Sequence, residues 1–148
     1  LKALEHEARA QLPAAQWLPR RAQLDSLLDV ADLPAAWRAI SQLQNDQDPL
    51  LARAGRTLSE GCPLTAHLVW EQIRRAKQLS LAEVFRMEYA MSLNCCRHPE
   101  FPEGVRARLI DKDNQPHWHW PEVSGISAAE IAAHFQPAWD GEHPLADL

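Results

Sequence analysis

Residues 80–97 read SLAEVFRMEYAMSLNCCR, and this stretch decides the fold class. Ser80 is a typical helix N-cap, and Glu83 follows three residues later, as in a capping box. Apolar residues then recur at helical spacing as far as the cysteines. The stretch predicts the longest helix of the chain.

The same helical character extends over the rest of the sequence. Glycine occurs only five times, whereas alanine, leucine and other strong helix formers are plentiful. Asp32 and Asp48 are expected N-caps, Pro63 is an expected helix start and Gly61 an expected helix end. No alternation of apolar and polar residues persists long enough to predict a strand. The fold class is therefore all-α, with little or no strand. Helices are expected at 1–12, 20–31, 32–44, 48–61, 63–78, 80–97 and 127–135, and an ordered, aromatic-anchored loop at 113–127.

Composition and charge exclude several classes of function. The formal net charge is −5 and the basic residues are scattered, so a nucleic-acid interface is not expected. No apolar run approaches the ~20 residues that cross a bilayer, and no leader pattern is visible, so neither membrane insertion nor secretion is expected. Three cysteines, two of them adjacent, favour a reducing, cytoplasmic setting. Leu1 opens directly into helix-like sequence, which indicates a piece of a longer protein.

Glu88 is the candidate acid of the 80–97 helix. Leu81, Phe85 and Ser92 share a stripe with it at 100° per residue, together with Val84 and Cys95, so Glu88 is expected to be buried. A catalytic acid would need such a position, but a structural glutamate paired with an arginine or with backbone N–H groups is the favoured interpretation.

Metal and nucleophile patterns are weak. His117 and His119 lie two residues apart, and Cys95, Cys96, His98 and His134 could gather near them, yet neither CxxC nor HExxH occurs, so no metal site is predicted. No serine lies in a G-x-S-x-G motif, and the adjacent cysteines close a helix, where the dipole raises a thiol pKa. The six tryptophans are interpreted as core residues and loop anchors.

Residues 79–118 carry a resemblance to a known family. Its most specific parts are Met87-Glu88-Tyr89, Phe101 with Glu103-Gly104-Val105-Arg106-Ala107, Leu109 to Asp113, Pro116 and Trp118. This ordered series resembles the C-terminal region of 3-hydroxyisobutyryl-CoA hydrolases, a branch of the crotonase (enoyl-CoA hydratase/isomerase) superfamily. The chain departs from the family pattern at Cys62 to Thr65, at Glu100 and at Trp120. These departures leave the exact substrate less certain than the fold.

The resemblance implies a division of labour within a larger acyl-CoA enzyme. Residues 1–148 would form its helical C-terminal domain, with a weakly matched part at 1–61, a family-like part at 62–136 and a tail at 137–148. In crotonases the N-terminal part binds the acyl-CoA, polarises the thioester carbonyl and supplies the acidic residues, so no catalytic residue is expected in this chain. The implied partners are that N-terminal core, the acyl-CoA substrate and further copies of the protein. No cofactor is expected beyond the coenzyme A thioester that serves as substrate.

The implied reaction converts 3-hydroxyisobutyryl-CoA to 3-hydroxyisobutyrate and coenzyme A, in valine catabolism. Two alternatives stay open, an enoyl-CoA hydratase or isomerase and a non-catalytic helical assembly module.

Seven residues are singled out by the resemblance. Lys112 loosely matches a lysine that lies near the coenzyme A phosphates in related hydratases, and Arg106 is a second possible contact; the alternative for Lys112 is a solvated pair with Asp111 or Asp113. Phe101 and Pro102 are expected to start a helix, Glu103 to complement its dipole and Gly104 to permit a close approach. With Glu88, the structural motif is Glu88, Phe101, Glu103 and Gly104.

Overall fold

The computed structural model describes residues 12–148, which contain seven α-helices and no strand. The all-α prediction is therefore confirmed for this part of the chain, while residues 1–11 of the first predicted helix lie outside it. The helices are α2 (Arg21–Leu28), α3 (Leu33–Gln42), α4 (Pro49–Ser59), α5 (Pro63–Ala76), α6 (Leu81–Arg97), α7 (Glu100–Val105) and α8 (Ala128–Ala133).

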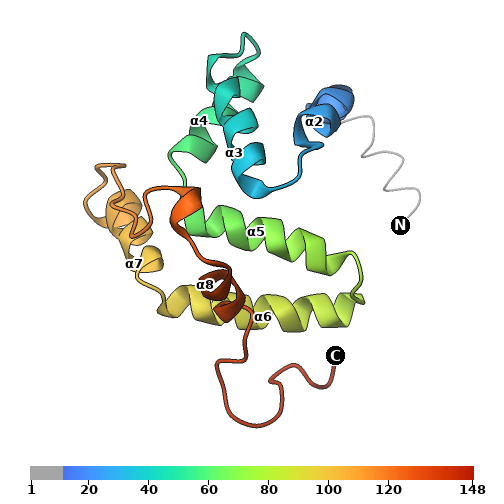
Figure 1. Ribbon diagram of the computed structural model, residues 1–148, viewed down its shortest axis with the longest axis vertical. Helices are drawn as coiled ribbons and strands as arrows, with labels where there is room; N and C mark the ends of the chain where they lie inside the picture. The colour runs from blue at the N-terminus through green and yellow to red at the C-terminus, as the bar shows by residue number, and fades with distance from the viewer. Residues whose placement is uncertain (1–11) are drawn as a thin grey trace.

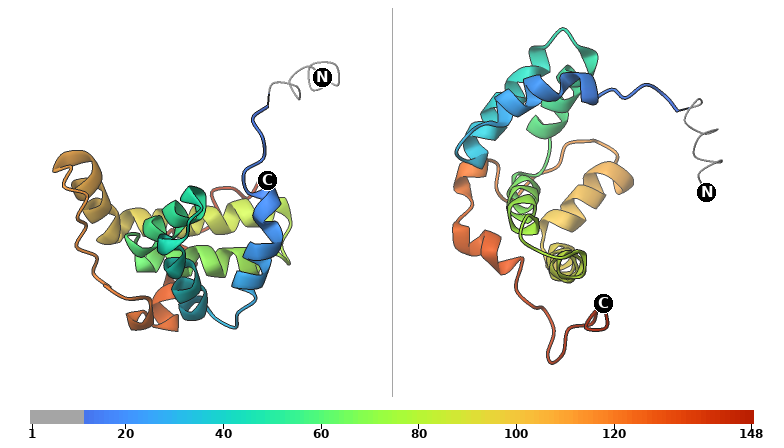
Figure 2. Two further views of the ribbon diagram at one scale, coloured as in Figure 1. Left: turned by 90° about the horizontal axis from the view of Figure 1, so that it is seen from above. Right: turned by 90° about the vertical axis from the view of Figure 1, so that its right-hand side faces the viewer.

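Helix α5 lies at the centre of the fold (Figure 1). Helices α2, α3 and α4 gather on one side of it, and α6 with the C-terminal tail lies on the other, as Figure 1 and the right-hand view of Figure 2 show. Helix α8 packs against α5 near α6, and α7 continues from the end of α6. No helix between residues 12 and 148 combines the length and the apolar character that a membrane crossing requires.

The predicted helix starts are confirmed by their caps. Asp32 accepts a hydrogen bond from the Ala35 N–H at 2.8 Å, and Asp48 accepts one from the Leu50 N–H at 2.9 Å. Ser80 and Glu83 form the predicted capping box. Local sequence is sufficient to place these starts, because a cap joins residues only two or three positions apart.

Several helices end a few residues before the predicted position, and α4 ends just before Gly61, the predicted helix end, but with a different geometry. Helix α2 stops at Leu28 rather than at residue 31, because Asp29 leaves the helical conformation with φ −75° and ψ 66°. Gly61 follows α4 but does not use the left-handed conformation, since Gly141 is the only glycine of residues 12–148 with a positive φ. A Cβ at Gly61 would lie 3.1 Å from the Thr57 carbonyl oxygen, so close approach to the helix end explains this glycine.

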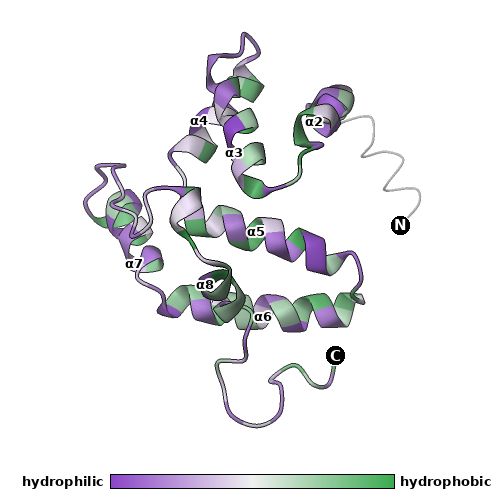
Figure 3. Ribbon diagram, in the orientation of Figure 1, coloured by the Kyte–Doolittle hydropathy of each residue, from purple (hydrophilic) through white to green (hydrophobic). Residues whose placement is uncertain are grey.

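The main core lies between α5, α6, α8 and the loop that precedes α8. Leu64 and Leu68 of α5 are buried against Ile126 and Phe135. Figure 3 shows α8, which packs against α5, as mostly hydrophobic ribbon. The partly buried side chains around this core are Cys62, Met87, Met91, Cys95, Trp120 and Ile131.

The predicted buried stripe of α6 is wrong at Leu81, Phe85 and Ser92, which are exposed, whereas Cys95 packs against the main core as predicted. Leu81 is 72% exposed and Phe85 47% exposed, because α6 turns Met87, Ala90 and Met91 towards α5 and α8 instead. Glu88 is only half-buried, and its Oε1 accepts a hydrogen bond from Gln72 Nε2 at 2.6 Å. A glutamine on α5 is thus the partner of Glu88, in place of the arginine or backbone N–H groups of the structural interpretation.

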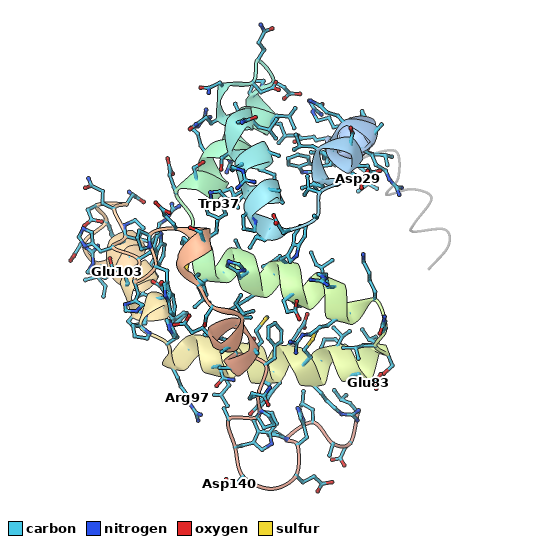
Figure 4. All side chains as sticks on the ribbon, viewed as in Figure 1. Asp29, Trp37, Glu83, Arg97, Glu103 and Asp140 are labelled. Carbon is cyan, nitrogen blue, oxygen red and sulfur yellow. The ribbon has the colours of Figure 1, made fainter. Side chains whose placement is uncertain are left out.

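The tail at 137–148 is fastened to α6 by polar side chains. Arg86 donates hydrogen bonds to the carbonyl oxygens of Leu145, Ala146 and Leu148 at 2.6–3.1 Å. Arg97 donates to the Ala138 carbonyl at 2.9 Å, near the labelled Arg97 in Figure 4. The tail is therefore an ordered part of this fold.

Candidate functional site

Arg106 organises the segment that carries the family resemblance. It begins a π-helical turn, Arg106–Ile110, directly after α7. All five N–H groups of its guanidinium donate hydrogen bonds at 2.6–3.0 Å: two to Glu103, one each to Asp111 and Asp113, and one to the Gln115 carbonyl oxygen. A contact of Arg106 with coenzyme A stays a prediction, and it would require at least one of these bonds to break.

The ion pairs around Arg106 fix the charges of its partners. Glu103 has its pKa lowered to about 2, mainly by the Arg106 hydrogen bonds and further by the His117 N–H, which lies 2.6 Å from its carboxylate. The pKa of Asp113 is lowered by the same guanidinium, and that of Arg106 is raised in return. This cluster closes the turn between α7 and the 113–126 loop; Figure 4 labels Glu103 among its side chains.

Lys112 lies at the tip of this turn. Its backbone has φ 57°, a left-handed conformation, and its side chain is exposed. The alternative pair with Asp111 or Asp113 is not formed, because Arg106 takes both carboxylates. Among the residues from 12 onward, Lys112 has no ion-pair partner within 4.0 Å. Its ammonium group is free to meet an anion.

Gly104 and Phe101 border a cavity of about 370 Å³ between α5, α6 and α7. A Cβ at Gly104 would lie 3.3 Å from Trp118 Cη2, so the close approach predicted for this glycine is to the Trp118 ring. Phe101 lines the cavity but is 53% exposed. Helix α7 starts at Glu100, one residue before the predicted start, and Pro99 occupies its N-cap position.

Glu100 stands out in the sequence only as a departure from the family pattern, and its role as an anchor of the loop was not predicted. It is only 7% exposed, and its carboxylate accepts hydrogen bonds from the His119 N–H at 3.2 Å and the Trp120 N–H at 3.4 Å. Glu100 thus anchors the middle of the loop as Glu103 anchors its start. The sequence offered one indication of a structural role for Glu100, its place in the first turn of a helix, where a carboxylate is favoured.

The cysteines and histidines of the described residues do not build a metal centre. No group of three or more potential metal-binding side chains occurs between residues 12 and 148. Cys62 and Cys95 are free thiols whose pKa values are raised chiefly by burial, which disfavours the nucleophilic thiolate. Cys96 is free and exposed.

A wide groove of about 1370 Å³ separates α2, α3 and α4 from α5. Its walls carry Trp17, Trp37 and Trp70, and the outward face of α5 adds Val69 and Ile73, which are 46% and 58% exposed. Figure 4 labels Trp37 on α3, on the side near α5. Three cations, Arg53, Arg74 and Lys77, line the groove against one carboxylate, Asp25.

The sequence profile of the enoyl-CoA hydratase/isomerase family matches residues 1–135. The chain belongs to this family. The match includes residues 1–61, where individual motifs carry little resemblance, so membership does not depend on the segment around Arg106 alone.

Named relatives give a narrower comparison. The 3-hydroxyisobutyryl-CoA hydrolases, named as mitochondrial, of Danio rerio, Gallus gallus and Homo sapiens are 38%, 34% and 31% identical to this chain over 88, 106 and 97 residues. These matches cover 60%, 72% and 66% of this chain but 23%, 28% and 25% of the relatives. The chain therefore spans about a quarter of the length of the curated relatives it matches.

Solved structures confirm the fold. An enoyl-CoA hydratase from Rhodobacter sphaeroides 2.4.1 superposes with a TM-score of 0.72 at 24% identity, over 86% of this chain and 37% of that protein. A carnitinyl-CoA dehydratase from Mycobacterium thermoresistibile gives the same TM-score and identity over 86% of this chain and 36% of its own. At this identity the likeness concerns fold rather than reaction.

Proposed function

We propose that this chain is the C-terminal helical part of an acyl-CoA thioester hydrolase that converts 3-hydroxyisobutyryl-CoA to 3-hydroxyisobutyrate and free coenzyme A. One observation carries the proposal: the named relatives that match the chain at 31–38% identity are 3-hydroxyisobutyryl-CoA hydrolases. We assign the catalytic carboxylates and the oxyanion-binding amides to the remainder of the polypeptide, because the chain spans about a quarter of the length of these relatives.

The direct test is a substrate comparison with the full-length protein. A thiol reagent should detect free coenzyme A released from 3-hydroxyisobutyryl-CoA. Crotonyl-CoA, followed by the loss of its enoyl absorbance, should be hydrated much more slowly. Fast hydration without thiol release would instead identify an enoyl-CoA hydratase, a reaction that the same scaffold supports.

Lys112 is the residue of this chain that we assign to coenzyme A. Its free ammonium and its position at the tip of the Arg106 turn support a phosphate contact, whereas Arg106 is occupied by its own carboxylates. Lys112→Ala in the full-length protein should raise KM severalfold and leave kcat nearly unchanged, because a phosphate far from the thioester contributes uniform binding. Arg38→Ala, which removes an exposed cation from α3, is the matched control. An unchanged KM for Lys112→Ala would remove Lys112 from the coenzyme A site.

The groove beside α5 supports packing against the remainder of the protein. The chain exposes 10654 Å² of surface, whereas a folded monomer of 16.7 kDa exposes about 7,600 Å². Even full exposure of residues 1–11 would account for at most about 1,800 Å² of the difference. The exposed surface that is still in excess is larger than the ~800 Å² that each partner buries in a standard interface. We assign the catalytic core of the same polypeptide to this surface.

Assembly is the second candidate function. A separate apolar surface, formed by Leu81, Phe85 and Tyr89 on α6, is 38–72% exposed and lies outside the groove. Exposed apolar side chains gathered on one helix suit a contact with another copy of the protein. Sedimentation of the full-length protein at several concentrations tests this, since a Phe85→Ser variant should shift any oligomer towards monomer. A monomer at all concentrations would argue against an assembly role.

A further inference from the structure

Four residues meet where α6 ends, and we refer to His98, Glu100, Trp120 and His134 as the clasp. The His98 ring stacks on Trp120, with centroids 5.2 Å apart and planes 16° apart. On another side, the His134 ring of the α8 C-terminus lies 5.2 Å from it. His98 therefore joins the end of α6 to the 113–126 loop and to the C-terminal end of α8.

The hydrogen bonds of the clasp define where its protons lie. His98 Nδ1 accepts a hydrogen bond from the Glu100 backbone N–H at 3.3 Å. A ring nitrogen that accepts carries no proton, so His98 is neutral in this arrangement, with its proton on Nε2. His134 differs, because its Nδ1 lies 2.9 Å from the Glu130 carbonyl oxygen and must donate to it. The two rings thus use opposite tautomers.

The charged groups around His98 come from every element packed against it. Glu100 lies on α7, His119 in the loop, and His134 and Glu130 on α8. Cys62, Cys95 and Arg108 line the cavity beside the His98 ring. The two carboxylates favour a proton on His98, whereas His134 and His119 oppose it.

We propose that the clasp is a proton-sensitive latch: a proton taken up at His98 Nδ1 breaks the bond from the Glu100 N–H and releases α8 and residues 117–120 from the end of α6. The step forms one covalent bond, between the proton and His98 Nδ1, and breaks no covalent bond. Protonated Nδ1 becomes a donor and faces a donor, so the Glu100 N–H loses its partner. The imidazolium also lies beside His134, which is only 6% exposed.

The direction of the response follows from burial. Burial first, and His134 second, hold the pKa of His98 below its usual value, and they outweigh the opposing carboxylates. The open state therefore binds a proton more readily than the closed state. The closed clasp keeps its full stability above the ordinary histidine pKa of about 6.5, and it loses stability as the pH falls below that value.

The latch does not depend on the identity of the substrate. Glu100 also holds the loop through the His119 and Trp120 N–H groups, so an open clasp loosens residues 117–120, while His67 of α5 still bonds to the Val123 carbonyl oxygen at 2.7 Å. Acid should therefore loosen the anchorage of this segment while α5 remains folded, because α5 has no hydrogen bond to His98.

Hydrogen exchange of the full-length protein at about pH 7.5 and about pH 5.0, corrected for intrinsic exchange rates, tests the latch. Peptides that cover 117–120 and 128–133 should lose protection severalfold at the lower pH, whereas peptides from α5 should not. His98→Asn should abolish the difference, because its amide oxygen can accept from the Glu100 N–H but does not titrate. His117→Asn, at a largely exposed histidine of the same loop, is the control and should respond like the wild type.

NMR titration of the His98 imidazole keeps the proposal falsifiable if His98→Asn fails to fold. The latch requires a His98 pKa below about 6.5 and a loss of protection that follows the same titration. Equal protection at both pH values, a response retained in His98→Asn, or a His98 pKa above the ordinary value would overturn it. None of these outcomes depends on thioester hydrolysis, so the latch and the proposed reaction fail independently.

Discussion

The two sides of α5 are built in different ways. On the side of α6, α7 and α8, polar side chains join segments that lie far apart in the sequence: Arg86 holds the tail, Glu100 holds the loop and Asn94 holds the carbonyl oxygens that follow α8. On the side of α2, α3 and α4, the groove is lined by apolar side chains, and Arg20 with Asp48 forms one distant ion pair.

This difference indicates which side depends on a partner. Directional hydrogen bonds to buried or half-buried groups specify one arrangement within the chain itself. Exposed apolar walls gain free energy only when another surface removes them from water. We infer that the α6–α8 side is largely self-supporting, whereas the α2–α4 side reaches its full stability only in the complete protein.

The largest expected effect contrasts neighbouring residues on the two faces of α5. Leu68→Ala should lower the free energy of unfolding of residues 1–148 by about 2–5 kcal/mol, because Leu68 is 3% exposed in the main core. Val69→Ala, on the groove face, should change it by less than about 0.5 kcal/mol. Urea unfolding measures both values.

The contrast becomes sharper in the full-length protein. Val69→Ala should then cost distinctly more than in residues 1–148, since the groove would be covered. An equal, small effect in both forms would show that the groove stays open to water, and it would remove the packing assigned to it.

The next effect concerns the interior of the α2–α4 side. A Cβ at Gly55 would lie 2.8 Å from the Leu43 carbonyl carbon and 2.9 Å from the Ile40 carbonyl oxygen, both backbone atoms that cannot rotate away. Gly55→Ala should therefore cost about 1–3 kcal/mol or more despite its better helix propensity. Gly125→Ala meets only an ordinary contact of 3.8 Å with Trp120 and is the matched control in thermal unfolding. Equal melting temperatures for the two variants would contradict this close packing.

The smallest expected effect is a change in how stability depends on pH. Glu103 has a pKa of about 2 against an ordinary value of about 4.5, so its contribution to stability is complete above about 4.5 and is lost as the pH falls towards 2. Glu103→Gln should lower the melting temperature at neutral pH, and its difference from the wild type should shrink in acid. A difference that stays constant between about pH 7 and about pH 3 would contradict the ion pair with Arg106.

Sequence predicts the parts of this structure that depend on near neighbours. The caps at Asp32, Asp48 and Ser80 were predictable because each joins residues two or three positions apart. The buried face of α6 was not, since α5 and α8 select the Met87 side over the equally apolar Phe85 side.

The site was predictable only in its location. The motif around Arg106 was visible in sequence, yet its five hydrogen bonds depend on a π-helical turn that brings Asp111 and Asp113 back towards Glu103. The clasp depends on contacts over more than thirty residues, from His98 to His134, and no spacing rule reveals it.

Release of free thiol from 3-hydroxyisobutyryl-CoA, compared between the full-length protein and residues 1–148 alone, tests the division of labour most directly. We expect rapid release by the full-length protein and none above background by residues 1–148. Thioester hydrolysis by residues 1–148 alone would contradict it, because these helices would then contain the reacting groups that we assign to the remainder of the polypeptide.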